Sequence, residues 1–375
     1  MSAGGGDELP RWVSLALLPA INIACALLAS GLVILAIGED PLAALGYLVT
    51  GALGSATGIG YTLYYATSLI FTGLAVALAF HAGLFNIGGE GQAYIGGLGV
   101  GLCCLVLSAV GGVPWWLALP ITILAGAVFG GAWAAVPGWL QAYRGSHIVI
   151  TTIMFNFIAS ALMAYLMVNV LIKPGQMSPE SREFDPSLFL PMMHEMLGGL
   201  GIEVEQTPLN LTFLLALLAC ALVWFLVWHT RWGFALRTVG ANEHAAHYAG
   251  VSPRRMVVLA MAASGALAGL VGINELQGVQ HKLLLNFQAG MGFTGIAVAL
   301  MGRAHPVGIV LSALLFGALY QGGSELSFEV QTISPELVVV IQGVVILFAG
   351  ALEHMFKPAL ARLFRPAPKP ATGVA

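Results

Sequence analysis

The chain has 375 residues, of which 58% are hydrophobic and only 8% are charged. A soluble globular domain carries about 25% charged residues, so the composition excludes that class. It also lacks the ten-residue alternation of polar and apolar positions that is typical of an outer-membrane barrel. The formal net charge of −3 says little about partners, among which we expect the lipid bilayer and no nucleic acid. We therefore predict an all-α integral membrane protein.

Ten apolar runs approach or exceed the roughly 20 residues that a helix needs to cross about 30 Å of hydrocarbon. These predicted spans lie near residues 12–37, 61–82, 92–112, 115–140, 148–172, 209–229, 255–276, 283–302, 305–321 and 334–352. Residues 41–58 are short and rich in glycine, and we expect them at the membrane interface. Residues 12–352 then form one membrane domain, between a disordered tail at 1–11 and a C-terminal tail at 353–375.

The distribution of Lys and Arg predicts the orientation. An even number of spans puts both termini on one side, and placing that side in the cytoplasm leaves only Lys173, Arg182 and Lys282 of the 14 basic residues outside. Both termini are therefore expected in the cytoplasm. The acidic loop at 173–208 is expected outside, where it could touch a partner, and the loop at 230–254 inside.

The four cysteines give no sign of a metal site or a disulfide. They all lie within apolar runs and form no C-x-x-C pair, so we expect them to pack as small apolar residues. They are Cys25, Cys103, Cys104 and Cys220.

One short sequence occurs twice. "TGLAVAL" at 72–78 and "TGIAVAL" at 294–300 match at six of seven positions. Many transporters are built from two related halves, so the match favours a two-fold internal repeat. Chance similarity in a chain this rich in Gly, Ala, Val and Leu is the alternative.

The stretch "GLFNIGGEGQ", 83–92, places polar side chains between two apolar runs. A charge at the centre of a membrane helix costs about 2.5–3.5 kcal/mol, so Glu90 requires a reason. Either Phe85, Asn86, Glu90 and Gln92 line a path for a polar solute, or Asn86 and Glu90 serve as helix caps at an ordinary turn.

A second polar cluster lies in "SHIVITTIMFNF", 146–157. Thr152 and Asn156 are four residues apart and share a helix face, where they either bond to other helices or line the path. Phe155 beside them either stacks on a ring or packs. A third, weaker set lies near Phe293, with Asn286 and Gln288.

The loop after the sixth span contains a short predicted helix. Asn242 is suited to cap its N-terminus and Gly250 to follow its C-terminus, and Ser252 and Pro253 then open the next span. A helix of about seven residues has little stability alone in water. We interpret it as a projection that docks into another protein; an ordinary connector is the alternative.

Four segments together resemble one family. They are "GLFNIGGEGQ", "VITTIMFNFIA" at 149–159, "LRTVGANEHAAHYAGVSPRR" at 236–255 and "GFTGIAVALMGRAHPVGIVLSALLFGAL" at 292–319. Together they are similar to the permease subunits of ABC importers, in the branch of the ribose and branched-chain amino acid permeases. Within that branch they most resemble nucleoside permeases that work with basic membrane lipoproteins. The resemblance covers about residues 12–352.

The resemblance implies a ten-helix permease in the bacterial inner membrane that pairs with a second permease chain. An external binding lipoprotein or periplasmic protein and two cytoplasmic ATPase subunits would complete the importer. The predicted short helix would be the coupling helix, which transmits ATP-driven closure to the path. Its coupling residues would be Gly240, Ala241, Asn242, Glu243, His244 and Gly250.

The sequence lacks the G-x-x-x-x-G-K-[ST] phosphate loop, so we expect this chain to bind no cofactor and a partner to use the ATP. The implied solute is a nucleoside, with a sugar such as ribose or an amino acid as alternatives. A secondary transporter would instead need ionisable pairs deep in its spans. A membrane enzyme would need paired carboxylates or a His cluster, and we predict no catalytic residue.

Overall fold

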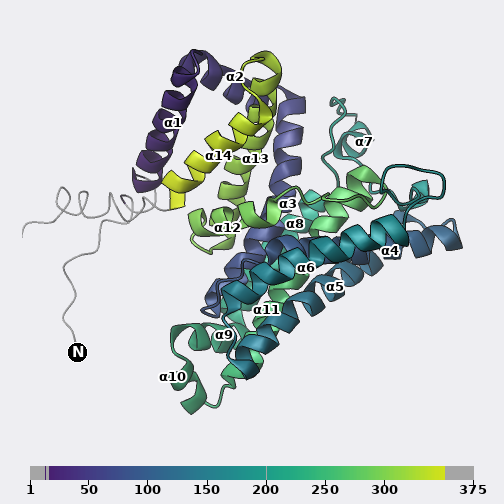
Figure 1. Ribbon diagram of the computed structural model, residues 1–375, viewed down its shortest axis with the longest axis vertical. Coiled ribbons are helices and arrows are strands. Elements are labelled where there is room, and N and C mark those ends of the chain that lie inside the picture. The colour runs from purple at the N-terminus through teal and green to yellow at the C-terminus, as the bar shows by residue number, and fades with distance from the viewer. Residues whose placement is uncertain (1–12, 14–16, 200, 351–375) are drawn as a thin grey trace, which may run out of the picture. The chain divides into compact units, whose positions relative to one another are not determined.

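The computed structural model describes residue 13 and residues 17–199 and 201–350, so the tails predicted at 1–11 and 353–375 lie outside the described residues (Figure 1). The described chain is helical. Its α-helices are α1 (Leu18–Ala36), α2 (Pro41–Leu53), α3 (Ala56–His81), α4 (Gly89–Val110), α5 (Trp115–Arg144), α6 (Ile148–Asn169), α7 (Met193–Gly198), α8 (Thr212–His229), α9 (Arg231–Ala241), α10 (Glu243–Tyr248), α11 (Pro253–Gly269), α12 (Met291–Met301), α13 (Pro306–Glu329) and α14 (Pro335–Gly350). A 3-10 turn at Pro186–Leu188 and a π-helix, η3 (Ile273–Gln280), complete the described elements.

Within these residues, seven helices are long and apolar enough to cross a membrane. They are α3, α4, α5, α6, α8, α13 and the continuous stretch Pro253–Gln280. The other three predicted spans coincide with shorter apolar helices, in α1, α12 and α14. The predicted multi-pass helical architecture is therefore confirmed.

One predicted span is wrong in its first half. The run at 283–302 was expected to be helical throughout, but α12 starts only at Met291. The preceding stretch has positive φ at His281, Asn286, Ala289 and Gly290. Left-handed backbone is incompatible with a right-handed helix, so α12 is a half-length helix that begins inside the protein.

The chain divides into two compact units, with boundaries inside α2 and α13. The first comprises residues 1–47 and 326–375, where α1 packs against α14. Ile34, Leu326 and Ile341 belong to its apolar core, and the Thr332 hydroxyl donates to the carboxylate of Glu39. The second unit, residues 48–325, contains the candidate site.

Helices α5 and α11 pack closely through paired glycines. α5 carries Gly126 and Gly130, and α11 carries Gly265 and Gly269, each pair four residues apart. A Cβ atom on Gly269 would lie 2.2 Å from the carbonyl oxygen of Gly126, and one on Gly265 would lie 2.3 Å from that of Gly130. A Cβ on Gly96 of α4 would lie 2.1 Å from Cα of Gly269. Small residues that let backbones approach are the usual basis of helix association in lipid, and here they hold α4, α5 and α11 together.

The repeated seven-residue segments lie in α3 and α12, which pack against each other. A Cβ atom on Gly73 would lie 2.9 Å from the side chain of Val298, and one on Gly295 would lie 2.4 Å from that of Thr72. The repeat thus supplies a small residue to each side of one helix contact. An internal duplication stays a prediction.

We expect Gly269→Val to destabilise the protein strongly. The added side chain would meet backbone atoms of α4 and α5 that cannot rotate away, and overpacking of this kind costs about 1–3 kcal/mol or more. The change should lower the thermal unfolding temperature in detergent by several degrees. Gly343→Ala, where nothing lies within 4 Å of the added Cβ, is the control and should leave that temperature unchanged. Equal unfolding temperatures for the two variants would contradict the glycine packing.

Candidate functional site

The stretch GLFNIGGEGQ forms a break between α3 and α4. α3 ends at His81, Gly83 has a φ of +73°, and α4 starts at Gly89 without a side-chain cap from Gly88. A break in a membrane helix exposes backbone N–H and C=O groups, which is tolerated only where protein or water satisfies them. The polar side chains of the stretch provide hydrogen-bond partners at this break.

Asn86 and Gln92 form a closed amide pair that is buried. Asn86 Nδ2 donates to Gln92 Oε1 at 2.8 Å, and Gln92 Nε2 donates back to Asn86 Oδ1 at 3.0 Å. Asn86 also accepts from the Gly88 N–H at 2.9 Å and donates to Ser264 Oγ of α11 at 2.9 Å. Ser264 in turn donates to the Ala75 carbonyl of α3 at 2.6 Å. The pair therefore ties the break to α3, α4 and α11.

Asn156 of α6 reaches the same break from the other side. Its Oδ1 accepts from the Gly91 N–H at 2.9 Å, and its Nδ2 donates to the Ile87 carbonyl at 3.0 Å. Thr152, one turn earlier, donates to the Ile148 carbonyl of its own helix at 2.8 Å. A Cβ on Gly88 would lie 3.1 Å from Cβ of Thr152. Asn156 is thus a side-chain substitute for the backbone bonds that the broken helix lacks.

Glu90 lies in the first turn of α4, and its carboxylate also caps α12. Its two oxygens accept from the N–H groups of Gly290 at 3.0 Å and Gly292 at 2.8 Å, at a helix start that has no side-chain cap of its own. A Cβ on Gly292 would lie 2.2 Å from the Glu90 nitrogen, so the two helix N-termini meet directly. A carboxylate is stabilised at each, which explains why this position carries one.

The three predicted phenylalanines are less enclosed. Phe85 stacks on Phe80 with ring centroids 5.3 Å apart, and Phe155 meets the edge of Trp133 at 5.2 Å. Phe85 and Phe293 are 36% and 49% exposed. The structure therefore separates the predicted residues into buried polar groups around the break and aromatic groups with free surface.

An aromatic pair that was not predicted as part of the site has one member within electrostatic range of Glu90. Tyr65 of α3 and Tyr320 of α13 are stacked, with centroids 5.6 Å apart and an interplanar angle of 26°. The Tyr320 hydroxyl lies 3.0 Å from Thr294 Oγ1 and within electrostatic range of Glu90. The signal was the motif "YTLYY" at 61–65, three tyrosines in an otherwise apolar span.

Gln288, only a weak candidate in the sequence, lies at the same place. Its side chain faces the Glu90 carboxylate, while its Oε1 is buried and has no hydrogen-bond partner among the described residues. A buried acceptor without a partner is costly, so this oxygen is a ready acceptor for a ligand donor.

A second polar network occupies η3. Glu275, fully buried, accepts from the Tyr64 hydroxyl at 2.5 Å and the Ser68 hydroxyl at 2.7 Å. Gln277 accepts from Thr122 at 2.8 Å and donates to the Leu188 carbonyl at 3.0 Å. π-Helical turns are rare and are frequent at functional sites. Through these bonds Glu275 joins α3 to the extension of α11.

The short helix predicted after the sixth span is present as α10, following α9 at one end of the second unit (Figure 1). Asn242 caps it by accepting from the Ala245 N–H at 3.0 Å, and Gly250 has a φ of +79°. Ala241, Asn242, Glu243, His244 and Gly250 are all exposed. Ser252 and Pro253 start α11 as expected.

Gly240 is also exposed, but one side of its backbone lies against the turn after α3. A Cβ atom there would lie 2.3 Å from the His81 carbonyl oxygen and 2.9 Å from the Gly83 nitrogen. The residues predicted for coupling therefore form an exposed group around α10, from the end of α9 to Gly250. Gly240 joins this group to the turn that precedes Asn86.

Comparison with known proteins identifies the chain. The family model described as branched-chain amino acid transport system / permease component matches residues 58–350. The chain belongs to this permease family. The match extends from α3 to the end of α14, so it includes every predicted site residue.

Curated relatives align with the permease over most of both chains. The guanosine ABC transporter permease protein NupP of Bacillus subtilis is 36% identical over 89% of this chain and 93% of its own. The glucose ABC transporter permease protein TsgB13 of Haloferax volcanii is 35% identical over 97% and 96%. The nucleoside ABC transporter permease protein NupB of Lactococcus lactis is 33% identical over 92% and 94%. The permease is thus a transport subunit of the ABC class and a multi-pass membrane protein.

We expect Glu90→Gln to destabilise the permease by about 1–3 kcal/mol. Glutamine keeps one acceptor oxygen, and its NH₂ group would face the N–H of Gly290 or Gly292 as a second donor. The measurement is thermal unfolding of the purified protein without solute. Glu203→Gln, which removes the same charge from an exposed loop position, is the control. An unfolding temperature for Glu90→Gln equal to that of the control would contradict the capping role.

Proposed function

We propose that the permease imports a nucleoside across the bacterial cytoplasmic membrane, driven by separate ATPase subunits. The observation that carries this proposal is the extent of the relationship to the guanosine permease of B. subtilis, 36% identical over 93% of that relative, together with the nucleoside permease of L. lactis. The relative named for glucose supports a sugar as the alternative solute.

The solute would pass the surface formed by Phe85, Glu90, Phe293, Tyr65 and Tyr320. Base–aromatic stacking contributes about 1–3 kcal/mol per base, and the Tyr65–Tyr320 pair offers ring faces for it. Glu90 and the free Gln288 oxygen would accept from the base or ribose. The four polar residues Asn86, Gln92, Thr152 and Asn156 are bonded to protein, so in this proposal they hold the path in shape from behind.

α10 would be the coupling helix that enters a cleft of an ATPase subunit. It has six residues and buries only Ala246, while Tyr248 is 91% exposed. An exposed aromatic on a short capped helix is the kind of side chain that dominates binding energy when it fills a partner's pocket. Movement of α10 would reach the break through the backbone contact of Gly240 with His81 and Gly83.

The remaining parts of the importer follow from the same proposal. The positive-inside rule puts α10 and both termini in the cytoplasm and residues 173–208 outside, where a substrate-binding lipoprotein or periplasmic protein would deliver the solute. A second permease chain, identical or not, would complete the path. ATP would be bound by the partner ATPase and not by this chain.

We expect Tyr248→Ala to abolish uptake and co-purification of the ATPase while leaving the permease folded. Loss of a central aromatic anchor costs about 2 kcal/mol or more of binding free energy. Within the described residues, the ring contact that the change removes is the one with the neighbouring His247, at 6.5 Å between centroids. Tyr165→Ala on α6, where the tyrosine is 61% exposed, is the matched control and should co-purify normally. Normal co-purification of Tyr248→Ala would show that α10 is only a connector.

For the solute, we expect the transporter reconstituted with its partners to take up labelled guanosine, and Tyr320→Leu to raise its KM by about 5- to 150-fold, the equivalent of 1–3 kcal/mol. Tyr320→Phe keeps the ring and should stay near the wild-type value. Uptake of ribose or glucose without guanosine would support the sugar alternative and contradict the nucleoside proposal.

A further inference from the structure

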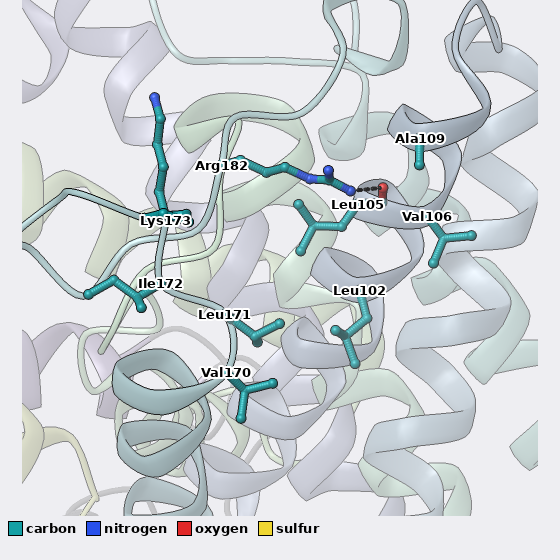
Figure 2. A pocket seen from close by; sticks show the side chains of 10 residues that line it. Leu102, Leu105, Val106, Ala109, Val170, Leu171, Ile172, Lys173 and Arg182 are labelled. Atoms are coloured by element: carbon teal, nitrogen blue, oxygen red, sulfur yellow. Dashed lines mark hydrogen bonds between the residues drawn. The ribbon is translucent and has the colours of Figure 1, made fainter.

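A cavity of about 500 Å³ lies between the C-terminal part of α4 and the chain that follows α6 (Figure 2). One wall is the apolar side of α4, with Leu102, Leu105 and Val106, and the other includes Val170 and Ile172. The volume is within the range of about 300–1,000 Å³ typical of small-molecule sites. The cavity is separate from the break at Glu90, which lies at the opposite end of α4.

The apolar wall opens onto the surface of the chain. Val106 is 65% exposed and Val170 is 60% exposed. Both lie at the ends of spans, so in a bilayer this surface meets lipid acyl chains or another subunit.

Two cations lie at the edge of this apolar wall. Arg182 donates from Nη2 to the Leu105 carbonyl at 3.1 Å, which holds its guanidinium over the last turns of α4, as Figure 2 shows. The Lys173 side chain extends away from the wall just after the end of α6 (Figure 2). Neither forms a salt bridge with another described residue. Arginine has five N–H donors, so one bond to a carbonyl leaves others free for a ligand.

Two acidic side chains of this loop, Glu180 and Asp185, are engaged with other groups. Glu180 is paired with Lys282 at 2.7 Å and accepts from Gln176 at 2.9 Å, and the hydrogen bond from Lys282 lowers the pKa of Glu180. Asp185 accepts from the Ser187 N–H at 2.9 Å. Among the described residues, neither of these two carboxylates forms a salt bridge with Lys173 or Arg182.

We propose that this cavity binds one anionic glycerophospholipid, with its phosphate between Lys173 and Arg182 and an acyl chain on the α4 wall. A free anion would use the two cations but leave the apolar wall empty, and an uncharged lipid would use only the wall. Basic residues at the end of a span lie at headgroup depth, where a phosphate meets apolar surface. The bound lipid would connect α4, which carries Glu90, to the end of α6, which carries Asn156.

The test is native mass spectrometry of the assembled transporter in detergent, titrated with phosphatidylglycerol, with phosphatidylcholine of the same acyl chains, and with inorganic phosphate alone. We expect one phosphatidylglycerol to bind at least tenfold more tightly than phosphatidylcholine, and phosphate alone not to bind. Lys173→Gln should remove most of this preference, and Lys173→Gln with Arg182→Gln all of it. Val106→Trp, which fills the cavity, should reduce binding of both lipids.

Arg231→Gln removes one exposed cation at the start of α9 and should leave the preference unchanged. Loss of the Arg182 bond to Leu105 can destabilise the double variant by itself. The single variant Lys173→Gln then decides the test, because the described residues make no side-chain hydrogen bond or salt bridge with Lys173 that the change would remove. Equal affinity of the wild type for the two lipids, or unchanged preference in Lys173→Gln, would overturn the proposal. So would an assembled transporter that excludes lipid while Val106→Trp dissociates its permease chains, since the cavity would then be a subunit interface.

Discussion

The carboxylate of Glu90 joins two helices that both begin inside the protein. α4 and α12 each start with backbone N–H groups that have no partner in their own helix, and Glu90 bonds to two of those of α12 while lying in the first turn of α4. A hydrogen bond to a charged group contributes about 1.5–3 kcal/mol. Two of them contribute about 3–6 kcal/mol, which is enough to offset the cost of about 2.5–3.5 kcal/mol for placing an ionised carboxylate in a membrane span. Glu90 is therefore compatible with a stable break.

The break needs glycine as much as it needs the carboxylate. Glu90 reaches α12 because Gly292 leaves room for the backbone of Glu90, where a Cβ would lie 2.2 Å from its nitrogen. Gly91 lets Asn156 approach in the same way, since a Cβ there would lie 2.8 Å from Asn156 Oδ1. With Asn86 and Gln92 bonded to each other, the polar groups named here have partners. The broken segment is thus held in one conformation by α6, α11 and α12.

The features of this chain that could be predicted from the sequence are those with a local signal. Apolar runs are long and continuous, so the spans were predictable, and Asn242 and Gly250 are cap residues whose chemistry acts within a few positions. Contacts with partners that are remote in the sequence could not be predicted. Glu90 could be assigned to a path or a cap, but the N–H groups it binds are about 200 positions away, and no local sequence pattern identifies them.

The late start of α12 was not predicted because the run that begins at residue 283 is mostly apolar. Left-handed backbone at Asn286 and Ala289 does not change the hydropathy of the sequence. The GxxxG pairs of α5 and α11 were readable from the sequence, although not which helices they join.

A close glycine contact also connects α9 and α10 to the proposed path. Gly240 lies on the backbone of the turn after α3, where a Cβ would be 2.3 Å from the His81 carbonyl oxygen. The ring of His81 contacts Trp228 at 5.0 Å between centroids, and its Nε2–H donates to the Ala304 carbonyl at 3.0 Å. Close-packed contacts transmit displacement because they are hard to compress. A shift of α9 at Gly240 would therefore move the turn at Gly83, three residues before Asn86. Asn86 is bonded to Gln92 of α4 and Ser264 of α11, so that movement would displace α4 and α11 together. The displacement of α4 would also move Glu90, whose carboxylate is bonded to the start of α12.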